Sequence, residues 1–102
     1  MQIDKEIDVL EREQTEEPPL YAVVYHNDPY TPFDFVVITL TEILHKSEEE
    51  AVHIARIAEN NNRSVAGVYV YEYAENYVNS ILVRAKKYQY PLLVTIEPES
   101  SN

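Results

Sequence analysis

The sequence predicts an α+β domain in which three helices pack against a three-stranded antiparallel sheet, in the order β-α-α-β-α-β. Short runs rich in β-branched and aromatic residues predict the three strands, at 21–26, 65–70 and 92–97. Between these runs, apolar residues recur at the spacing of one helical face, and residues that favour helix ends bound each segment. With 102 residues, the chain is expected to form a single domain with one modest core.

The first two helices are delimited by residues that favour helix ends. Thr31 is expected to cap the first helix, with Pro32 at its first helical position. Ser47 and Glu50 have the residue types and spacing of a capping box at the start of the second helix. Asparagines at 60–62 are expected to end that helix, because asparagine tolerates left-handed backbone angles.

Gly67 is the only glycine of the chain and lies inside the second predicted strand. A glycine in a strand often marks a bulge or a close contact of the backbone, so one of these is expected here. The third helix is predicted to begin at about Glu72, and Pro91 prevents its continuation. The third strand then closes the sheet.

The ends of the chain differ in composition from its centre. Three segments are expected, namely a mobile acidic extension, a folded domain and a frayed C-terminus, at 1–19, 20–98 and 99–102. The extension holds seven acids and two bases. Ile3, Ile7 and Leu10 have helical spacing and predict a short transient helix, which Pro18 and Pro19 would end.

The net charge of −10 restricts the possible partners. It disfavours nucleic acid and anionic membranes, because both attract lysine and arginine. No apolar run is long enough to span a bilayer, and no secretory leader is expected. Cysteine is absent, which fits a reducing compartment, so a cytoplasmic protein is expected.

Residues suited to catalysis or to metal binding are not arranged for either purpose. His26, His45 and His53 lack the spacing of zinc ligands, and a single glycine cannot form a glycine-rich phosphate loop. No serine has a nucleophile-elbow context, and the acids at 48–50 are explained by a helix start. We therefore expect a binding protein rather than an enzyme, with no metal and no cofactor.

The most informative segment, at 27–37, joins the first strand to the first helix and has the sequence NDPYTPFDFVV. It places an amide and a carboxylate, those of Asn27 and Asp28, at the edge of an apolar surface. Such acceptors beside an apolar wall can hold a positively charged amino group that carries an apolar side chain.

This segment resembles the signature stretch of the ClpS adaptor family. The resemblance is carried by Asn27-Asp28, Tyr30-Thr31-Pro32 and Phe35-Val36-Val37, and by shorter matches in the family's order at 49–51, 67–69, 74–75 and 91–93. It covers about 21–97 and implies the ClpS fold. By this resemblance the chain is a divergent ClpS adaptor. Such adaptors bind proteins with a bulky hydrophobic N-terminal residue (an N-degron) and deliver them to a Clp AAA+ unfoldase for proteolysis.

The resemblance implies that an asparagine, an acid and a histidine bind the α-amino group of the substrate, in a pocket between the first two helices and the sheet. Asn27 matches the asparagine. Pro29 stands where the family usually has the acid that follows Asp28, and Glu59 stands at the histidine position. Glu59 either restores the carboxylate lost at Pro29 or is a solvated residue at a helix end.

The expected ligand-binding set comprises Asn27, Asp28, Thr31, Phe33, Val36, Ala55, Ala58, Glu59 and Leu92. Phe33 takes a gate position that is usually methionine in the family. Ala55 and Ala58 replace bulkier apolar residues, and Tyr25 and His26 replace aliphatic ones. The alanines either deepen the pocket or only permit close helix packing, and Phe33, Tyr25 and His26 are placed to close the space that they leave.

The resemblance also implies a surface for the unfoldase. Glu72 matches an acidic position with which the family docks on the N-terminal domain of the unfoldase, whereas Tyr77 stands where a lysine is usual. The acidic extension at 1–19 matches the family's N-terminal extension, which the unfoldase engages during delivery, and a monomer is expected. Because two of the three amine ligands have changed, an alternative is a regulator or decoy that binds the unfoldase without recognising N-degrons.

Overall fold

The computed structural model of the chain describes residues 18–99. Its elements are β1 (Leu20–His26), α2 (Phe33–Glu42), α3 (Glu48–Asn61), β2 (Arg63–Val70), α4 (Tyr71–Lys87) and β3 (Leu93–Pro98). The predicted α+β class and the β-α-α-β-α-β order are confirmed. The predicted extension lies outside the described residues except for its last two, Pro18 and Pro19. Residues 100–102 lie outside them as well.

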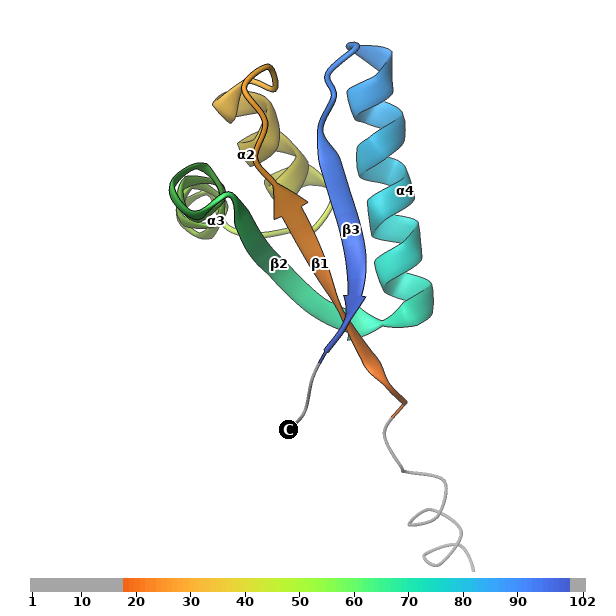
Figure 1. The fold of residues 1–102 in the computed structure, drawn as a ribbon. Helices are drawn as coiled ribbons and strands as arrows, with labels where there is room; N and C mark the ends of the chain where they lie inside the picture. The colour runs from red at the N-terminus through yellow and green to blue at the C-terminus, as the bar shows by residue number, and fades with distance from the viewer. Residues whose placement is uncertain (1–17, 100–102) are drawn as a thin grey trace, which may run out of the picture.

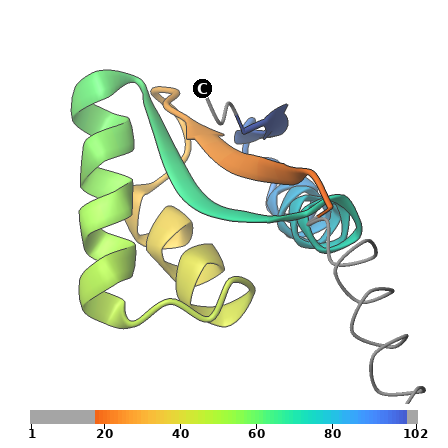
Figure 2. The same ribbon diagram turned by 90° about the horizontal axis from the view of Figure 1, so that it is seen from below.

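The three strands form one antiparallel sheet in the order β2-β1-β3, with β1 in the centre (Figure 1). α4 packs along all three strands, α3 packs on β2 and β1, and α2 packs on α3. Figure 2 shows α2 and α3 side by side and apart from α4. Within residues 18–99, no helix is long and apolar enough to cross a lipid bilayer.

One hydrophobic core joins the sheet to the three helices. Val23 and Tyr25 of β1 enter it from the same face of the sheet, since alternate residues of a strand share a face. Leu40 of α2 and Ile81 of α4 are fully buried in it. The contribution of α3 consists of buried alanines, which bring this helix close to the sheet.

The ends of the helices test the predicted caps. Ser47 and Glu50 form the complete capping box, and Asn62 adopts the left-handed conformation, with φ 74°, at the end of α3. The predicted cap at Thr31 is wrong, because Pro32 is the N-cap and α2 begins one residue later. The Thr31 hydroxyl instead donates to the Asp28 carboxylate at 2.7 Å.

The bulge predicted at Gly67 is present. Val23 pairs with Gly67 and Val24 pairs with Val65, so that Ala66 is the extra residue of β2. A Cβ atom at Gly67 would come within 3 Å of the Tyr69 ring. Glycine therefore provides the space that this tyrosine occupies.

Candidate functional site

A cavity of about 240 Å³ lies where the end of β1, the β1–α2 corner and the last turns of α3 meet. All nine residues predicted to bind the ligand line it. They are Asn27, Asp28, Thr31, Phe33, Val36, Ala55, Ala58, Glu59 and Leu92. Three further residues complete the lining, namely Tyr25, His26 and Pro29. Tyr25 and His26 were expected to lean toward this space, and Pro29 stands where the family usually has an acid.

The Asp28 carboxylate organises the corner. Its Oδ1 accepts from the backbone amides of Tyr30 and Thr31, both at 2.8 Å, and its Oδ2 accepts from the Thr31 hydroxyl at 2.7 Å. A carboxylate has about four lone-pair positions, so three of them are used within the loop. Asp28 therefore shapes the cavity edge and has little remaining capacity for a ligand.

The polar edge of the cavity is formed by Asn27 and Glu59, which are both exposed. The backbone amide of Asn27 donates to the carbonyl of Asn62 at 2.9 Å. Because Asn62 follows the last turn of α3, this bond holds the corner against the helix end that carries Glu59. No ion pair engages the Glu59 carboxylate among residues 18–99. One amide and one uncompensated carboxylate thus face the same cavity.

The inner end of the cavity is formed by Tyr25, which is 1% exposed. Its hydroxyl donates to Thr39 Oγ1 at 2.8 Å, since the Thr39 proton is donated to the carbonyl of Val36. Burial raises the pKa of the Tyr25 phenol well above its ordinary value of 10.0. The tyrosine therefore stays neutral and adds no charge to the cavity.

His26 also lines the cavity but is held by the neighbouring strand. Its Nε2 lies 2.8 Å from Thr95 Oγ1, and the Thr95 hydroxyl donates to Glu97. These partners place the proton on Nε2, because the threonine hydrogen is already used. The ring is therefore fixed against β3 and does not fill the cavity.

The apolar walls come from α2, α3 and the start of β3. Ala55, Ala58 and Leu92 are buried, whereas Phe33 is half-buried at the edge. The Arg56 guanidinium lies 5.0 Å from the centre of the Phe33 ring and stabilises its position from outside. The alanines belong to the core and also line the cavity, so close helix packing and an open cavity coexist.

Comparisons with known proteins identify the family. The family model "ATP-dependent Clp protease adaptor protein ClpS" matches residues 16–95. The chain belongs to the ClpS family. The ClpS adapter of Myxococcus xanthus is 42% identical over 88 residues, which cover 86% of this chain and 82% of the relative. The ClpS adapter of Deinococcus radiodurans is 41% identical over 91 residues, which cover 89% and 80%.

A solved structure of ClpS2 from Agrobacterium tumefaciens, bound to L-phenylalaninamide, has the same fold with a TM-score of 0.79. It is 31% identical and covers 81% of this chain and 100% of its own. These ClpS relatives are named adaptors of the Clp protease and not enzymes. Between residues 18 and 99, no three histidine, aspartate or glutamate side chains are grouped to hold a metal ion.

The residues that the ClpS resemblance assigns to the unfoldase lie away from the cavity. Glu72 is exposed in the first turn of α4, which follows the strand residue paired with Leu20 at the opposite end of β1. Tyr77 is half-buried, and its ring packs edge-on against Tyr69 with the centroids 4.9 Å apart. Tyr77 is therefore partly used by the core, whereas Glu72 is available to a partner.

Proposed function

We propose that this ClpS chain binds proteins through a free α-amino group and a bulky hydrophobic N-terminal side chain, and delivers them to a Clp AAA+ unfoldase. The observation that carries the proposal is the 240 Å³ cavity, whose edge is polar and whose walls are apolar. The polar edge matches the amino group of an N-terminal residue, and the apolar walls match its side chain. The neighbouring ClpS2, which was solved with L-phenylalaninamide, supports the same class of ligand.

Recognition of the amino group rests on Asn27 and Glu59. An ammonium offers three donors, and its burial requires nearby acceptors. The Asn27 amide oxygen and the Glu59 carboxylate supply acceptors at the cavity edge, whereas the Asp28 carboxylate is committed to the loop. An internal peptide nitrogen carries no charge and a single hydrogen, so it matches this edge poorly.

Recognition of the first side chain rests on the apolar walls. The side chain enters between Phe33 and Val36 on one side and Ala55 and Ala58 on the other, with Leu92 beneath. Each buried methylene contributes about 0.8 kcal/mol, so large side chains are favoured over small ones. Phe33 acts as a movable wall, because it is half-buried at the cavity edge, between the core and Arg56.

Delivery rests on a second surface that leaves the cavity open. Glu72, with the adjoining part of Tyr77, contacts the N-terminal domain of the unfoldase at the other end of β1. A single copy of the chain therefore binds substrate and unfoldase at the same time. The acidic segment 1–17 is joined to β1 through Pro18 and Pro19 at this second end, and the unfoldase engages the segment during delivery.

The proposal is tested by titration of peptides that begin with Phe, Tyr, Trp or Leu, beside copies with an acetylated N-terminus. We expect binding of the free peptides and a loss of at least tenfold on acetylation. Equal affinity for both forms would refute the amine role. Binding of the unfoldase without any peptide binding would instead identify a regulator or decoy.

A further inference from the structure

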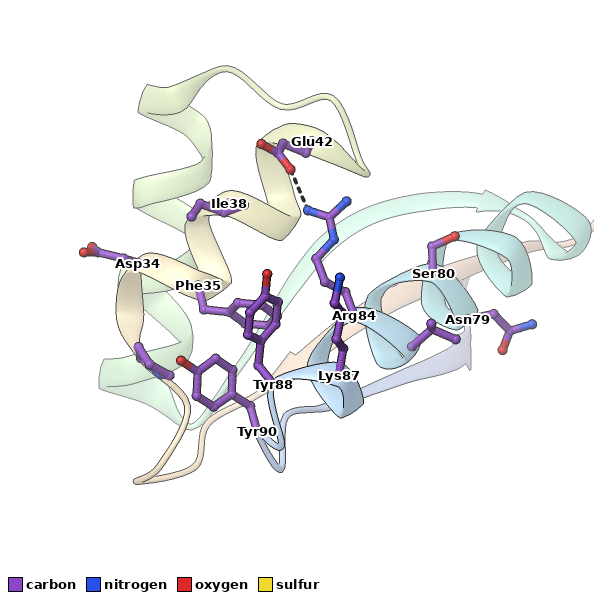
Figure 3. A pocket seen from close by; sticks show the side chains of 12 residues that line it. Asp34, Phe35, Ile38, Glu42, Asn79, Ser80, Arg84, Lys87, Tyr88 and Tyr90 are labelled. Atoms are coloured by element: carbon purple, nitrogen blue, oxygen red, sulfur yellow. Dashed lines mark hydrogen bonds and ion pairs between the residues drawn. The ribbon is translucent and has the colours of Figure 1, made fainter.

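A second and larger hollow separates α2 from the C-terminal half of α4 (Figure 3). It has a volume of about 1030 Å³ and is distinct from the cavity at Asn27. It arises because α2 packs on α3 while α4 packs on the sheet, so that the two helices diverge. We refer to it below as the α2–α4 groove.

Large apolar side chains that line the groove are exposed to solvent. Ile38 is 43% exposed, Tyr88 is 55% exposed and Val83 is 70% exposed, and all three line the groove. Its floor is the ring of Phe35, which Tyr88 and Tyr90 contact edge-on at 5.8 Å and 4.8 Å between centroids. Contiguous exposed apolar surface of this kind indicates an interaction site.

The charges around the groove favour an acidic occupant. Of the six lysines and arginines between residues 18 and 99, three lie in the last turn of α4, and two of these, Arg84 and Lys87, line the groove. Arg84 is paired with Glu42 at 2.5 Å across one end of the groove. The Lys87 ammonium lies 5.9 Å from the centre of the Tyr88 ring and has no ion-pair partner among the described residues.

The acids of the groove do not cancel this basic edge. Glu42 is neutralised by Arg84, and Figure 3 shows the Asp34 side chain directed away from α4. Residues 18–99 as a whole carry an excess of acids, eleven against six bases, which repels an acidic segment. The end of α4 is therefore the part of this domain to which such a segment is attracted.

We propose that the N-terminal segment of the same chain, residues 1–17, docks reversibly in the α2–α4 groove. Its seven acids and two bases give it a net charge of −5, complementary to the basic turn of α4. Ile3, Ile7 and Leu10 are spaced four and three apart, so one face of a helical turn presents all three to the groove. Asp4, Glu6 and Asp8 lie between these apolar residues and reach Lys87 at the groove edge.

The length of the segment fits this path. The groove lies between α2 and the C-terminal half of α4, toward the end of β1 that carries His26 (Figure 1). β1 has seven residues, and at about 3.3 Å per residue it spans about 23 Å. Residues 11–17, when extended, cover about the same distance, and residues 3–10 as a helix add about 12 Å. The segment therefore reaches the groove without strain.

Docking would cover the exposed apolar side chains of the groove while the adaptor is free. Binding of the segment by another protein would expose these side chains again. Docking is independent of the proposed binding of N-terminal residues, because the groove and the cavity share no exposed apolar residue. Its failure is thus distinguishable from failure of peptide binding, which is measured at the cavity.

The test is paramagnetic relaxation enhancement in the full-length chain. Because the chain has no cysteine, Gln2→Cys carries one nitroxide label beside Ile3. We expect amide broadening confined to α2 and to residues 80–88 of α4, and its loss in 0.5 M salt. The variant Lys87→Glu should weaken docking about fivefold. The matched control Arg63→Glu should leave docking unchanged, because Arg63 pairs with Glu97 outside the groove.

A second sample mixes nitroxide-labelled chains without ¹⁵N with ¹⁵N-enriched chains without nitroxide. In this mixture only docking between two copies of the chain broadens the signals. Broadening that is absent in the mixture supports docking within one chain. Broadening that persists in the mixture shows a second copy in the groove and overturns the proposal. Uniform broadening, or broadening at other elements, overturns it as well.

Discussion

The carboxylate of Glu59 is exposed at the edge of the cavity and lacks an ion-pair partner among the described residues, so its charge is available to a ligand. Replacement by glutamine keeps the shape and one acceptor oxygen but removes the charge. A charge-assisted hydrogen bond contributes about 1.5–3 kcal/mol. Because Glu59 is exposed and solvent screens it, we take the lower end, which corresponds to about a tenfold loss of affinity.

The assay for Glu59→Gln is fluorescence anisotropy with a labelled peptide that begins with Phe, measured with a free and with an acetylated N-terminus. Only the free peptide should bind about tenfold more weakly, and the difference should shrink as salt rises from 0.05 to 0.5 M. Glu75→Gln is the matched control, since Glu75 is exposed on α4 and does not line the cavity. An equal loss for both peptides, or no loss for either, would refute the role of the charge.

Three further predictions concern the surroundings of the cavity and the core. Asp28→Ala removes three hydrogen bonds within the corner. It should therefore weaken free and acetylated peptides alike, and lower the free energy of unfolding by about 1–2 kcal/mol, whereas an effect on the free peptide alone would contradict its loop role. Because burial raises the pKa of Tyr25 above 10.0, the unfolded chain releases this proton first. Stability should then fall above about pH 10 by up to about 1.4 kcal/mol per pH unit. Tyr25→Phe should reduce that slope in urea unfolding between pH 9 and 11, and an unchanged slope would exclude Tyr25 as the cause. Gly67→Ala places a methyl group against the Tyr69 ring and should cost about 1–3 kcal/mol in thermal unfolding. The cost should be smaller in the Tyr69→Ala background, and an equal cost there would show that the contact is not responsible.

Local sequence patterns predicted the elements and most of their ends. The capping box of Ser47 and Glu50 involves residues three apart, and the left-handed end at Asn62 depends on one side chain. The bulge beside Gly67 was expected for a similar reason, because glycine inside a strand has few other uses. Each of these features is governed by interactions between near neighbours in the chain.

The cap predicted at Thr31 failed because two local interactions competed for one hydroxyl. Residue preferences favour threonine at a helix start, but the Asp28 carboxylate three residues earlier accepts the same hydroxyl. The competition follows from the folded shape of the corner, which also draws both Asp28 oxygens into the loop. The sequence pattern alone therefore left both Asp28 and Glu59 in the expected ligand-binding set.

The identities of the cavity residues and the order of the elements were determined by the sequence, through residue types, helical spacing and resemblance to the ClpS family. Only the tertiary structure decided which acceptors are available, because it joins Asn27 to the end of α3 through the carbonyl of Asn62. It alone also revealed the α2–α4 groove. The divergence of two helices depends on what each packs against, and that information is spread over the whole core and not over neighbouring residues.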